Sequence, residues 1–383
     1  MKKILLGILV LGFMPVVLAG CWNYREVTQL TIIAGVAVDK TEEGEYLLTI
    51  EAVDLHKAGR ESNLKSVLLE TRGKSILDAA RNSININYPK LYWGHATTVI
   101  ISQEVAQDGL AEILDFLCRD AEPRLSMDLL ISHGKTAKEI LDANVLTAEI
   151  KSLEIKDILD EEKSLSKVVP IQVYQFINAL GGDGISAIAA CIDVTEQKGE
   201  KIIQLWGTAL FSEDKLIGFI GQEETQSLCF VLNEVRGGVL VVELGPKEED
   251  GKMTFEILKS KTEVKPSYTD GKLSLQVNIE TSVALDEVGG QKSFDQERAV
   301  EELTKKCEEY LKNQTEGLIK KIQTQYGSDV FGFGRCVFRS LPDVWRKMGK
   351  QWGTHFKELE VTVTPIIKFE HSGLLRKPVT VGD

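Results

Sequence analysis

Cysteine and proline are both scarce in this chain of 383 residues, which has six of the first and nine of the second. Apolar residues make up 43% and charged residues 27%, so disordered, collagen-like and polytopic membrane proteins are excluded. No CxxC pair or other zinc-ligand spacing occurs. We therefore expect a globular protein without a metal site. The six cysteines are residues 21, 118, 191, 229, 307 and 336.

The chain also lacks an excess of positive charge. It has 45 Lys and Arg against 57 Asp and Glu, a net charge of −12. Neutralisation of phosphates by basic side chains is the main source of nucleic-acid affinity. Nucleic acid is therefore not an expected partner.

The N-terminus carries the strongest local pattern. Lys2 and Lys3 precede an apolar run over residues 4–18, which is shorter than the about 20 residues of a membrane-spanning helix. A charged start followed by a short apolar run is typical of a secretory signal peptide. The run ends in Leu18-Ala19-Gly20-Cys21, which resembles the bacterial lipobox. This resemblance implies that residues 1–20 are a signal peptide and that Cys21 carries diacylglycerol as the first mature residue.

Two acyl chains are what a firm attachment requires. Each buried CH₂ contributes about 0.8 kcal/mol, so one chain binds reversibly and two hold firmly. Loss of Lys2 and Lys3 with the leader changes the net charge from −12 to −14, and anionic headgroups repel that charge. Two alternatives remain open: an uncleaved N-terminal anchor helix, and an ordinary signal peptide followed by a chance cysteine.

The residues after Cys21 resemble the Ger(x)C family of spore germination lipoproteins. The pattern C-W-[DN]-x-R-E-[IV] matches residues 21–27, and further landmarks of that family follow in order to about residue 373. These landmarks are Gly35–Asp39, Gly73–Arg81, Gly94-His95 before Val99–Ser102, Trp206–Phe211 with Lys215–Gly218, Asp329–Gly334, Pro342–Trp345 and Phe356.

The resemblance implies a function. Ger(x)C proteins are the C subunits of nutrient germinant receptors, so we expect a palmitate-bearing lipoprotein that takes part in spore germination and is not an enzyme. It implies a place on the outer face of the inner spore membrane and assembly with two integral-membrane subunits, A and B. No cofactor or metal is expected, apart from the diacylglycerol on Cys21. The alternative is an exported lipoprotein that binds a solute or acts as an enzyme of the cell envelope.

Apolar periodicity predicts a mixed α/β (α+β) fold of more than one domain, with mixed or antiparallel sheets packed with helices. We place the boundary near residue 198, between an N-terminal α/β region (21–198), with a possible subdivision near 110–145, and a C-terminal α/β domain (199–383). The predicted strands of the first region are 30–38, 46–53, 92–102, 125–132 and 185–194. Its predicted helices are 75–86, 104–119 and 136–143, and residues 144–170 are a connecting region. A further strand is predicted over 202–211, after the boundary.

The C-terminal region has clearer periods. Apolar and polar residues alternate over 273–285, which predicts a half-solvated strand. Residues 294–325 predict a long helix whose apolar stripe covers the buried face of the sheet. Residues 361–367 predict a late strand in which Pro365 marks an edge or a bulge.

No set of side chains in the sequence predicts catalysis. The five histidines have no metal-binding spacing. Gly332-Phe333-Gly334 is interpreted as a turn, and Gly181–Gly184 as a flexible connection. Arg119–Arg124 is interpreted as a solvated turn with local ion pairs. Most of the cysteines after Cys21 are expected to be reduced core thiols, and three tryptophans are expected to anchor the core: Trp206, Trp345 and Trp352.

Overall fold

The computed structural model describes residues 3, 30–54, 65–86, 90–144, 149–243, 251–288 and 296–371. The predicted signal peptide, Cys21 and the pattern over residues 22–27 lie outside these residues. Within them, no helix has the length and apolar character needed to cross a membrane.

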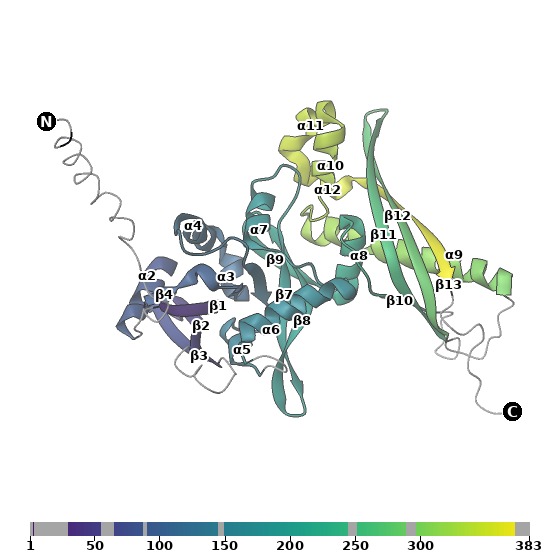
Figure 1. The fold of residues 1–383 in the computed structure, drawn as a ribbon. Helices are drawn as coiled ribbons and strands as arrows, with labels where there is room; N and C mark the ends of the chain where they lie inside the picture. Colours follow the sequence, from purple (N-terminus) through teal and green to yellow (C-terminus); the bar gives the residue numbers. More distant parts are fainter. Residues whose placement is uncertain are drawn as a thin grey trace, which may run out of the picture.

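The first layer is a mixed sheet that, in the described residues, has nine strands in the order β3-β2-β1-β5-β6-β7-β8-β9, with β4 paired to β1 (Figure 1). Strands β1, β5, β6 and β7 run parallel, and the hairpins at both ends are antiparallel. The strands are β1 Leu30–Lys40, β2 Tyr46–Asp54, β3 Lys65–Gly73, β4 Lys90–Tyr92, β5 Thr98–Ile101, β6 Asp128–Ser132, β7 Ile188–Gln197, β8 Glu200–Ser212 and β9 Lys215–Gly221.

Helices cover both faces of this sheet. Because successive side chains of a strand point to opposite faces, Val36 and Val38 pack in one core with α2, α3, α4 and α7, while Ala37 packs in another with α5 and α6. The helices are α2 Ile76–Asn82, α3 Gln103–Asp108, α4 Ala111–Arg119, α5 Lys138–Asp142, α6 Lys151–Glu161, α7 Val173–Leu180 and α8 Gln222–Leu232, with 3₁₀ turns η3 Ser83–Asn85, η4 Trp93–His95 and η5 Glu162–Ser164.

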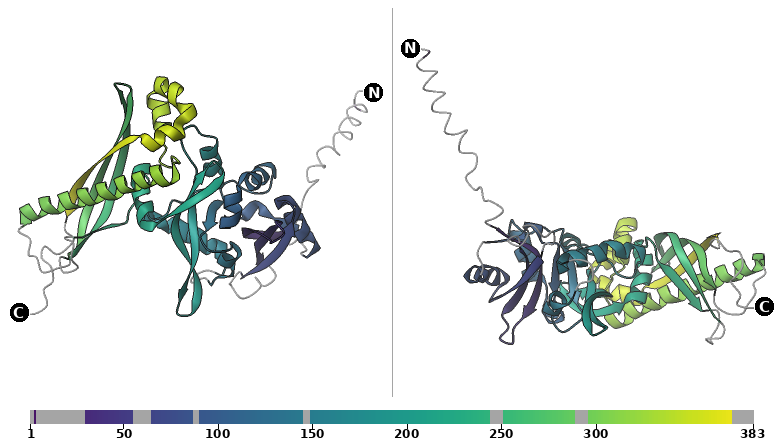
Figure 2. Two further views of the ribbon diagram at one scale, coloured as in Figure 1. Left: turned by 180° about the vertical axis from the view of Figure 1, so that it is seen from behind. Right: turned by 60° about the horizontal axis from the view of Figure 1, so that its bottom comes forward.

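The second layer is a sheet of four strands within the described residues, in the order β10-β11-β12-β13, covered on one face by the long helix α9 (Figure 2). The α+β fold and the long helix on a sheet are confirmed. Here the elements are β10 Val239–Glu243, β11 Lys252–Thr269, β12 Lys272–Val288, α9 Gln296–Lys321, the π-helical turn η7 Ile322–Tyr326, α10 Phe333–Ser340, α11 Pro342–Met348, η8 Gly349–Gln351, α12 Trp352–Glu358 and β13 Glu360–His371.

Several predicted elements are wrong in detail. The strand expected over 92–102 is interrupted by η4 between β4 and β5. The helix expected over 104–119 is two helices, because Gly109 has φ of +126°, which a right-handed helix does not allow. The connecting region expected over 144–170 contains helix α6, and α7 and the 18-residue strand β11 have no counterpart in the prediction.

Helix α6 owes its position to a buried carboxylate on a distant strand. Glu51 on β2 is fully buried and accepts hydrogen bonds from the backbone N–H groups of Lys151 and Ser152, both at 2.8 Å. The hydroxyl groups of Ser152 and Ser66 also donate to it, both at 2.6 Å. The first turn of a helix has unpaired N–H groups and favours negative charge. Glu51 therefore fixes the start of α6 against the sheet.

The free edge of β13 is closed by side chains of α9. Glu316 accepts from the N–H of Val363 at 3.2 Å, and Glu308 accepts from the N–H of Ile367 at 3.0 Å. Pro365, between them, has no N–H to offer. The edge position predicted for Pro365 is confirmed, since β13 is the last strand of the sheet.

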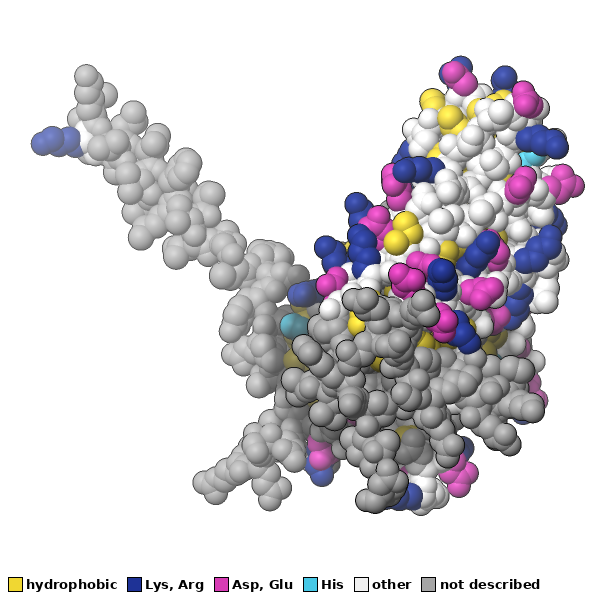
Figure 3. Space-filling model, turned by 90° about the vertical axis from the view of Figure 1, so that its right-hand side faces the viewer, with side chains coloured by type: hydrophobic (Ala, Val, Ile, Leu, Met, Phe, Trp, Pro, Cys, Tyr) yellow, Lys and Arg dark blue, Asp and Glu magenta, His cyan; other side chains and the backbone are white. Residues whose placement is uncertain are grey.

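The described part of the face shown in Figure 3 carries basic and acidic side chains interspersed with one another. Lys368 and Glu280, on the adjacent strands β13 and β12, form an exposed ion pair at 3.0 Å. The negative net charge is therefore not gathered into one patch on the described part of this face.

Candidate functional site

The two sheets are joined by a buried turn, residues 328–335, which we call the Asp329 turn. Its centre is the Asp329 carboxylate, which is 4% exposed. It accepts hydrogen bonds from the N–H groups of Phe333 (3.1 Å) and Gly334 (2.7 Å) and from the indole N–H of Trp352 (2.8 Å). Gly332 has φ of +72° and directly precedes α10, so the turn predicted over 332–334 ends at Gly332, and Phe333 and Gly334 already belong to α10. Asp329 thereby fixes α10 and α12 together.

The Asp329 turn is also bonded to the first sheet. Ser186 N–H donates to the Asp329 carbonyl at 2.8 Å, and Arg335 N–H donates to the Gly184 carbonyl at 2.8 Å. The Ser328 hydroxyl lies 2.7 Å from the carbonyl of Phe211 on β8. Flexibility was predicted for residues 181–184, and this is wrong for Gly184: its φ is +66° and its Cα lies against Gly334.

Gly334→Ala is expected to lower the free energy of unfolding by about 2 kcal/mol, because overpacking a tight contact typically costs this much. An added Cβ would lie 2.6 Å from both the Gly184 Cα and the Trp352 indole nitrogen. The matched control is Gly353→Ala in α12, where no atom lies within 4 Å of the added Cβ. The control should keep or slightly raise stability. Equal stability of the two variants in urea unfolding would contradict the expectation.

The Asp329 carboxyl should also give stability a distinct pH dependence. Burial raises its pKa to about 6, against the effect of its hydrogen bonds. A raised pKa means that the folded state binds the proton more tightly, so the contribution of Asp329 is full below about pH 4 and declines as pH rises through 6. The unfolding free energy of the wild type relative to Asp329→Asn should fall by about 3 kcal/mol over this range. A flat difference between the two unfolding curves would refute this.

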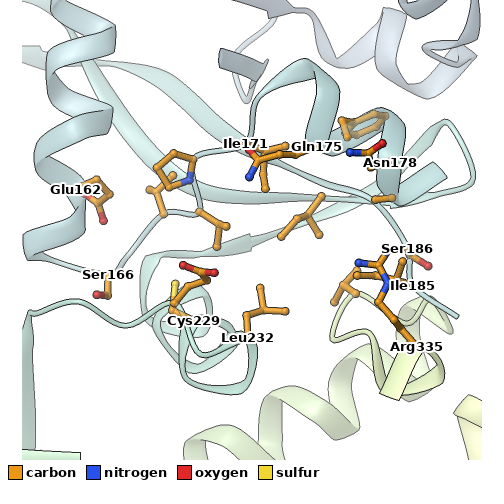
Figure 4. A pocket seen from close by; sticks show the side chains of 18 of the residues that line it. Glu162, Ser166, Ile171, Gln175, Asn178, Ile185, Ser186, Cys229, Leu232 and Arg335 are labelled. Carbon is orange, nitrogen blue, oxygen red and sulfur yellow. The ribbon is translucent and has the colours of Figure 1, made fainter. Parts of the chain in front are cut away.

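A cavity with a volume of about 520 Å³ lies beside the Asp329 turn (Figure 4). It lies between α7, α8, the start of β7 and the segment after η5, so both halves of the chain contribute to its wall. Its polar lining residues are Glu162, Ser166, Gln175, Asn178, Ser186, Glu234, Arg236 and Arg335.

Several of these polar side chains form hydrogen bonds with backbone groups of the cavity wall. Glu162 accepts from the N–H of Lys167 at 2.6 Å, and burial raises its pKa. The Ser166 hydroxyl donates to the Gly237 carbonyl at 2.9 Å and accepts from Arg236 N–H at 3.2 Å. The Gln175 side chain caps the start of its own helix. These groups act as structural hydrogen-bonding partners of the cavity wall.

The cavity also contains a thiol, which is not activated. Burial raises the pKa of Cys229 to about 12, so it is protonated at neutral pH and a poor nucleophile. Among the described residues, no group of three or more His, Cys, Asp or Glu side chains is arranged to hold a metal ion. The cavity has the size of a small-molecule site, but neither an activated thiol nor a metal site accompanies it in the described part of the chain.

The structure tests several smaller predictions and leaves one untested. The five cysteines after Cys21 are free thiols, and three of them are buried as expected, whereas Cys118 is exposed. The ion pairs of the predicted turn over 119–124 reach outside it: Arg119 pairs with Asp115 of α4 at 2.7 Å, and Glu122 pairs with Lys90 of β4. Trp352 is a core residue, and Trp345 packs against the same core. The lipid-bearing role of Cys21 stays a prediction, because this residue lies outside the described part.

One cluster was missed by sequence reasoning. The His133 ring stacks on Trp206 with centroids 3.9 Å apart, and its Nδ1 lies 2.9 Å from a carboxylate oxygen of Asp193. Phe219 contacts the same imidazole edge-on at 5.1 Å. His133 directly follows β6, and the other three residues lie on the neighbouring strands β7, β8 and β9, so no local spacing could have indicated the cluster. The stack and the pair fix a half-exposed imidazole on the surface.

The geometry defines a class: a two-sheet α+β protein whose sheets are joined by a buried turn. Two family models match the chain, "Spore germination protein N-terminal domain" over residues 23–194 and "Spore germination B3/ GerAC like, C-terminal" over residues 206–373. Together they match the chain almost from end to end, and it belongs to this Ger(x)C family of spore germination proteins.

Similar proteins agree with this assignment. Spore germination protein B3 of Bacillus subtilis (strain 168) is 25% identical over 96% of this chain and 98% of its own length. Spore germination protein KC of the same organism is 23% identical over 99% and 98%, respectively. The crystal structure of the GerBC protein shares the fold, with a TM-score of 0.59 at 21% identity, covering 88% of this chain and 96% of that one.

The predicted domain boundary near residue 198 falls between the two family matches. In the structure this position is the turn between β7 and β8, which pair antiparallel in the first sheet. The first sheet therefore continues to β9 at Gly221, beyond the predicted boundary. Division into regions 21–198 and 199–383 stays a prediction.

Proposed function

We propose that this chain is a lipid-anchored, non-enzymatic subunit of a nutrient germinant receptor, attached by diacylglycerol on Cys21 to the outer face of the inner spore membrane. The observation that carries the proposal is the position of the family match, which starts at residue 23 and runs to residue 373. The family match thus covers the whole folded part of the chain, and the lipobox-like residues 18–21 lie directly before it.

The proposal includes assembly with the integral-membrane A and B subunits. A tether that confines the chain to the membrane raises its effective concentration near those partners, so a weak contact suffices for assembly. The lipid supplies proximity and the folded surface supplies specificity. The engaged polar groups of the large cavity and the raised pKa of Cys229 support a binding role over catalysis.

The experiment is affinity purification from detergent-solubilised spore membranes. The wild-type chain, tagged at its C-terminus, should bring down two integral-membrane proteins. Cys21→Ala should instead accumulate as a precursor or leave the membrane almost completely, because loss of both acyl chains removes the attachment. Cys118→Ala is the matched control, since Cys118 is an exposed thiol of the folded body, and it should stay on the membrane.

Two results would count against the proposal. Unchanged membrane retention and processing of Cys21→Ala would rule out the acylation. Recovery of neither membrane subunit with the wild type would rule out the receptor assembly. Mass spectrometry of the mature N-terminal peptide separates the two questions, because it detects the lipid on Cys21 directly.

A further inference from the structure

Three exposed large hydrophobic side chains lie in one short stretch of the chain, residues 77–86, at one end of the molecule. Ile86 is 59% exposed and Ile84 57%, and Leu77 on the neighbouring helix α2 is 46% exposed. Leu77 and Ile84 flank a shallow groove that is also lined by Trp93 and Phe116. We call Leu77, Ile84 and Ile86 the end patch. Large hydrophobic side chains that cluster on a surface mark a contact with a partner or a membrane.

The end patch is not a loosely held segment. The opposite side of α2 is buried through Ile76 and Ala79, and the Thr71 hydroxyl of β3 donates to the Ala79 carbonyl at 2.8 Å. Ser75 caps the start of α2 through the N–H of Asp78. The sheet therefore holds the outer side of α2 in a fixed orientation.

The start of the described chain lies beside the end patch. Leu30, the first residue of β1, pairs with Lys90 of β4, and Lys90 also lines the groove. Both ribbon figures place α2 and β4 at the end of the molecule where the chain begins (Figures 1 and 2). Only eight residues, 22–29, lie between Cys21 and Leu30. Even fully extended, they span only about 30 Å.

We propose that the end patch inserts into the headgroup region of the bilayer and sets the orientation of the folded body on the membrane. This inference rests on the proposed lipid anchor, because the short connection holds this end of the molecule, and no other, close to the bilayer. Electrostatic attraction to lipid headgroups does not supply the contact, because the mature chain has a net charge of −14 and the basic residues of the groove, Arg81 and Lys90, are matched by two acidic ones, Asp120 and Glu122. Burial of apolar side chains therefore supplies it.

Nitroxide labels on the native lipoprotein in phosphatidylcholine vesicles test the proposal. One label is placed at Ile86→Cys and a matched control at Asp270→Cys, in the exposed β11–β12 turn away from α2. Both variants carry Cys118→Ser and Cys336→Ser, which remove the thiols that are not buried. The measured quantity is the ratio of the label's collision rate with oxygen to its collision rate with a water-soluble nickel complex. This ratio should be severalfold higher at residue 86 than at residue 270. High salt should not change this ratio.

Each other outcome overturns the inference in a distinguishable way. Equal, water-like ratios at both positions on vesicle-bound protein would show that the end patch does not enter lipid, while the anchor stands. If the label at residue 86 is shielded from the nickel complex only in native membranes, the end patch contacts a protein partner. If it is already shielded before vesicles are added, the end patch contacts a second copy of this chain. A chain that takes up label at Cys21 and leaves the vesicles would refute the lipid anchor, and with it the inference.

Discussion

Asp329→Ala is expected to lower the free energy of unfolding by about 3 kcal/mol or more at pH 7. The substitution leaves three donors without their acceptor, namely the N–H groups of Phe333, Gly334 and the Trp352 indole. A buried donor without a partner costs about 1 to 3 kcal/mol. Urea unfolding followed by far-UV circular dichroism measures the loss.

The matched control for this substitution is Asp343→Ala. Asp343 is an aspartate of α11, close in sequence, whose side chain is 81% exposed and pairs with Arg346. Loss of an exposed pair of this kind costs about 0 to 1 kcal/mol. If Asp329→Ala were no more damaging than Asp343→Ala, the Asp329 turn would not be the structural joint described above.

The second large effect is expected for Glu51→Ala, which should destabilise the chain by about 3 kcal/mol. The substitution removes the common acceptor of two backbone N–H groups of α6 and of the hydroxyl groups of Ser152 and Ser66. Because Glu51 is fully buried, water cannot replace it. Hydrogen exchange should speed up in α6 more than in α9, since the contact lies at the start of α6.

Glu70→Ala on the neighbouring strand β3 is the control for Glu51→Ala. The Glu70 side chain is 52% exposed and lies 3.6 Å from the Lys138 amine. Its removal should change stability by less than about 0.5 kcal/mol. Fast exchange throughout the Glu51→Ala variant, without preference for α6, would indicate global unfolding and contradict the local role assigned to Glu51.

Periodic segments could be predicted from the sequence because one face of each is buried. The alternating residues of β12 and the apolar stripe of α9 meet in one core, as expected. Strand β11 was missed because residues 259–265, Lys-Ser-Lys-Thr-Glu-Val-Lys, are nearly all hydrophilic. They form a strand because β12 pairs with them along their length. Helix α6 was missed because its N-terminal acceptor, Glu51, is 100 residues away from Lys151.

The Asp329 turn, which joins the two sheets, could be predicted from the sequence only in part. The pattern over Asp329–Gly334 indicated a family landmark, which lies within the C-terminal family match, and a turn, of which only Gly332 lies outside α10. The position of Gly184 against Gly334 depends on two segments about 150 residues apart, and no local pattern encodes such a contact. Cys21 was assigned by resemblance to a lipobox and remains a proposal.

The edge of β13 that side chains of α9 cover has a consequence if many copies of the chain are anchored to one membrane, as proposed above. Unpaired strand edges recruit other strands, and confinement to two dimensions would raise the rate of such encounters. Glu308 and Glu316 occupy two of the outward N–H groups, and Pro365 removes the one between them. The outward positions 363, 365 and 367 thus offer no free N–H group to a neighbouring copy of the chain, which disfavours strand addition along this stretch.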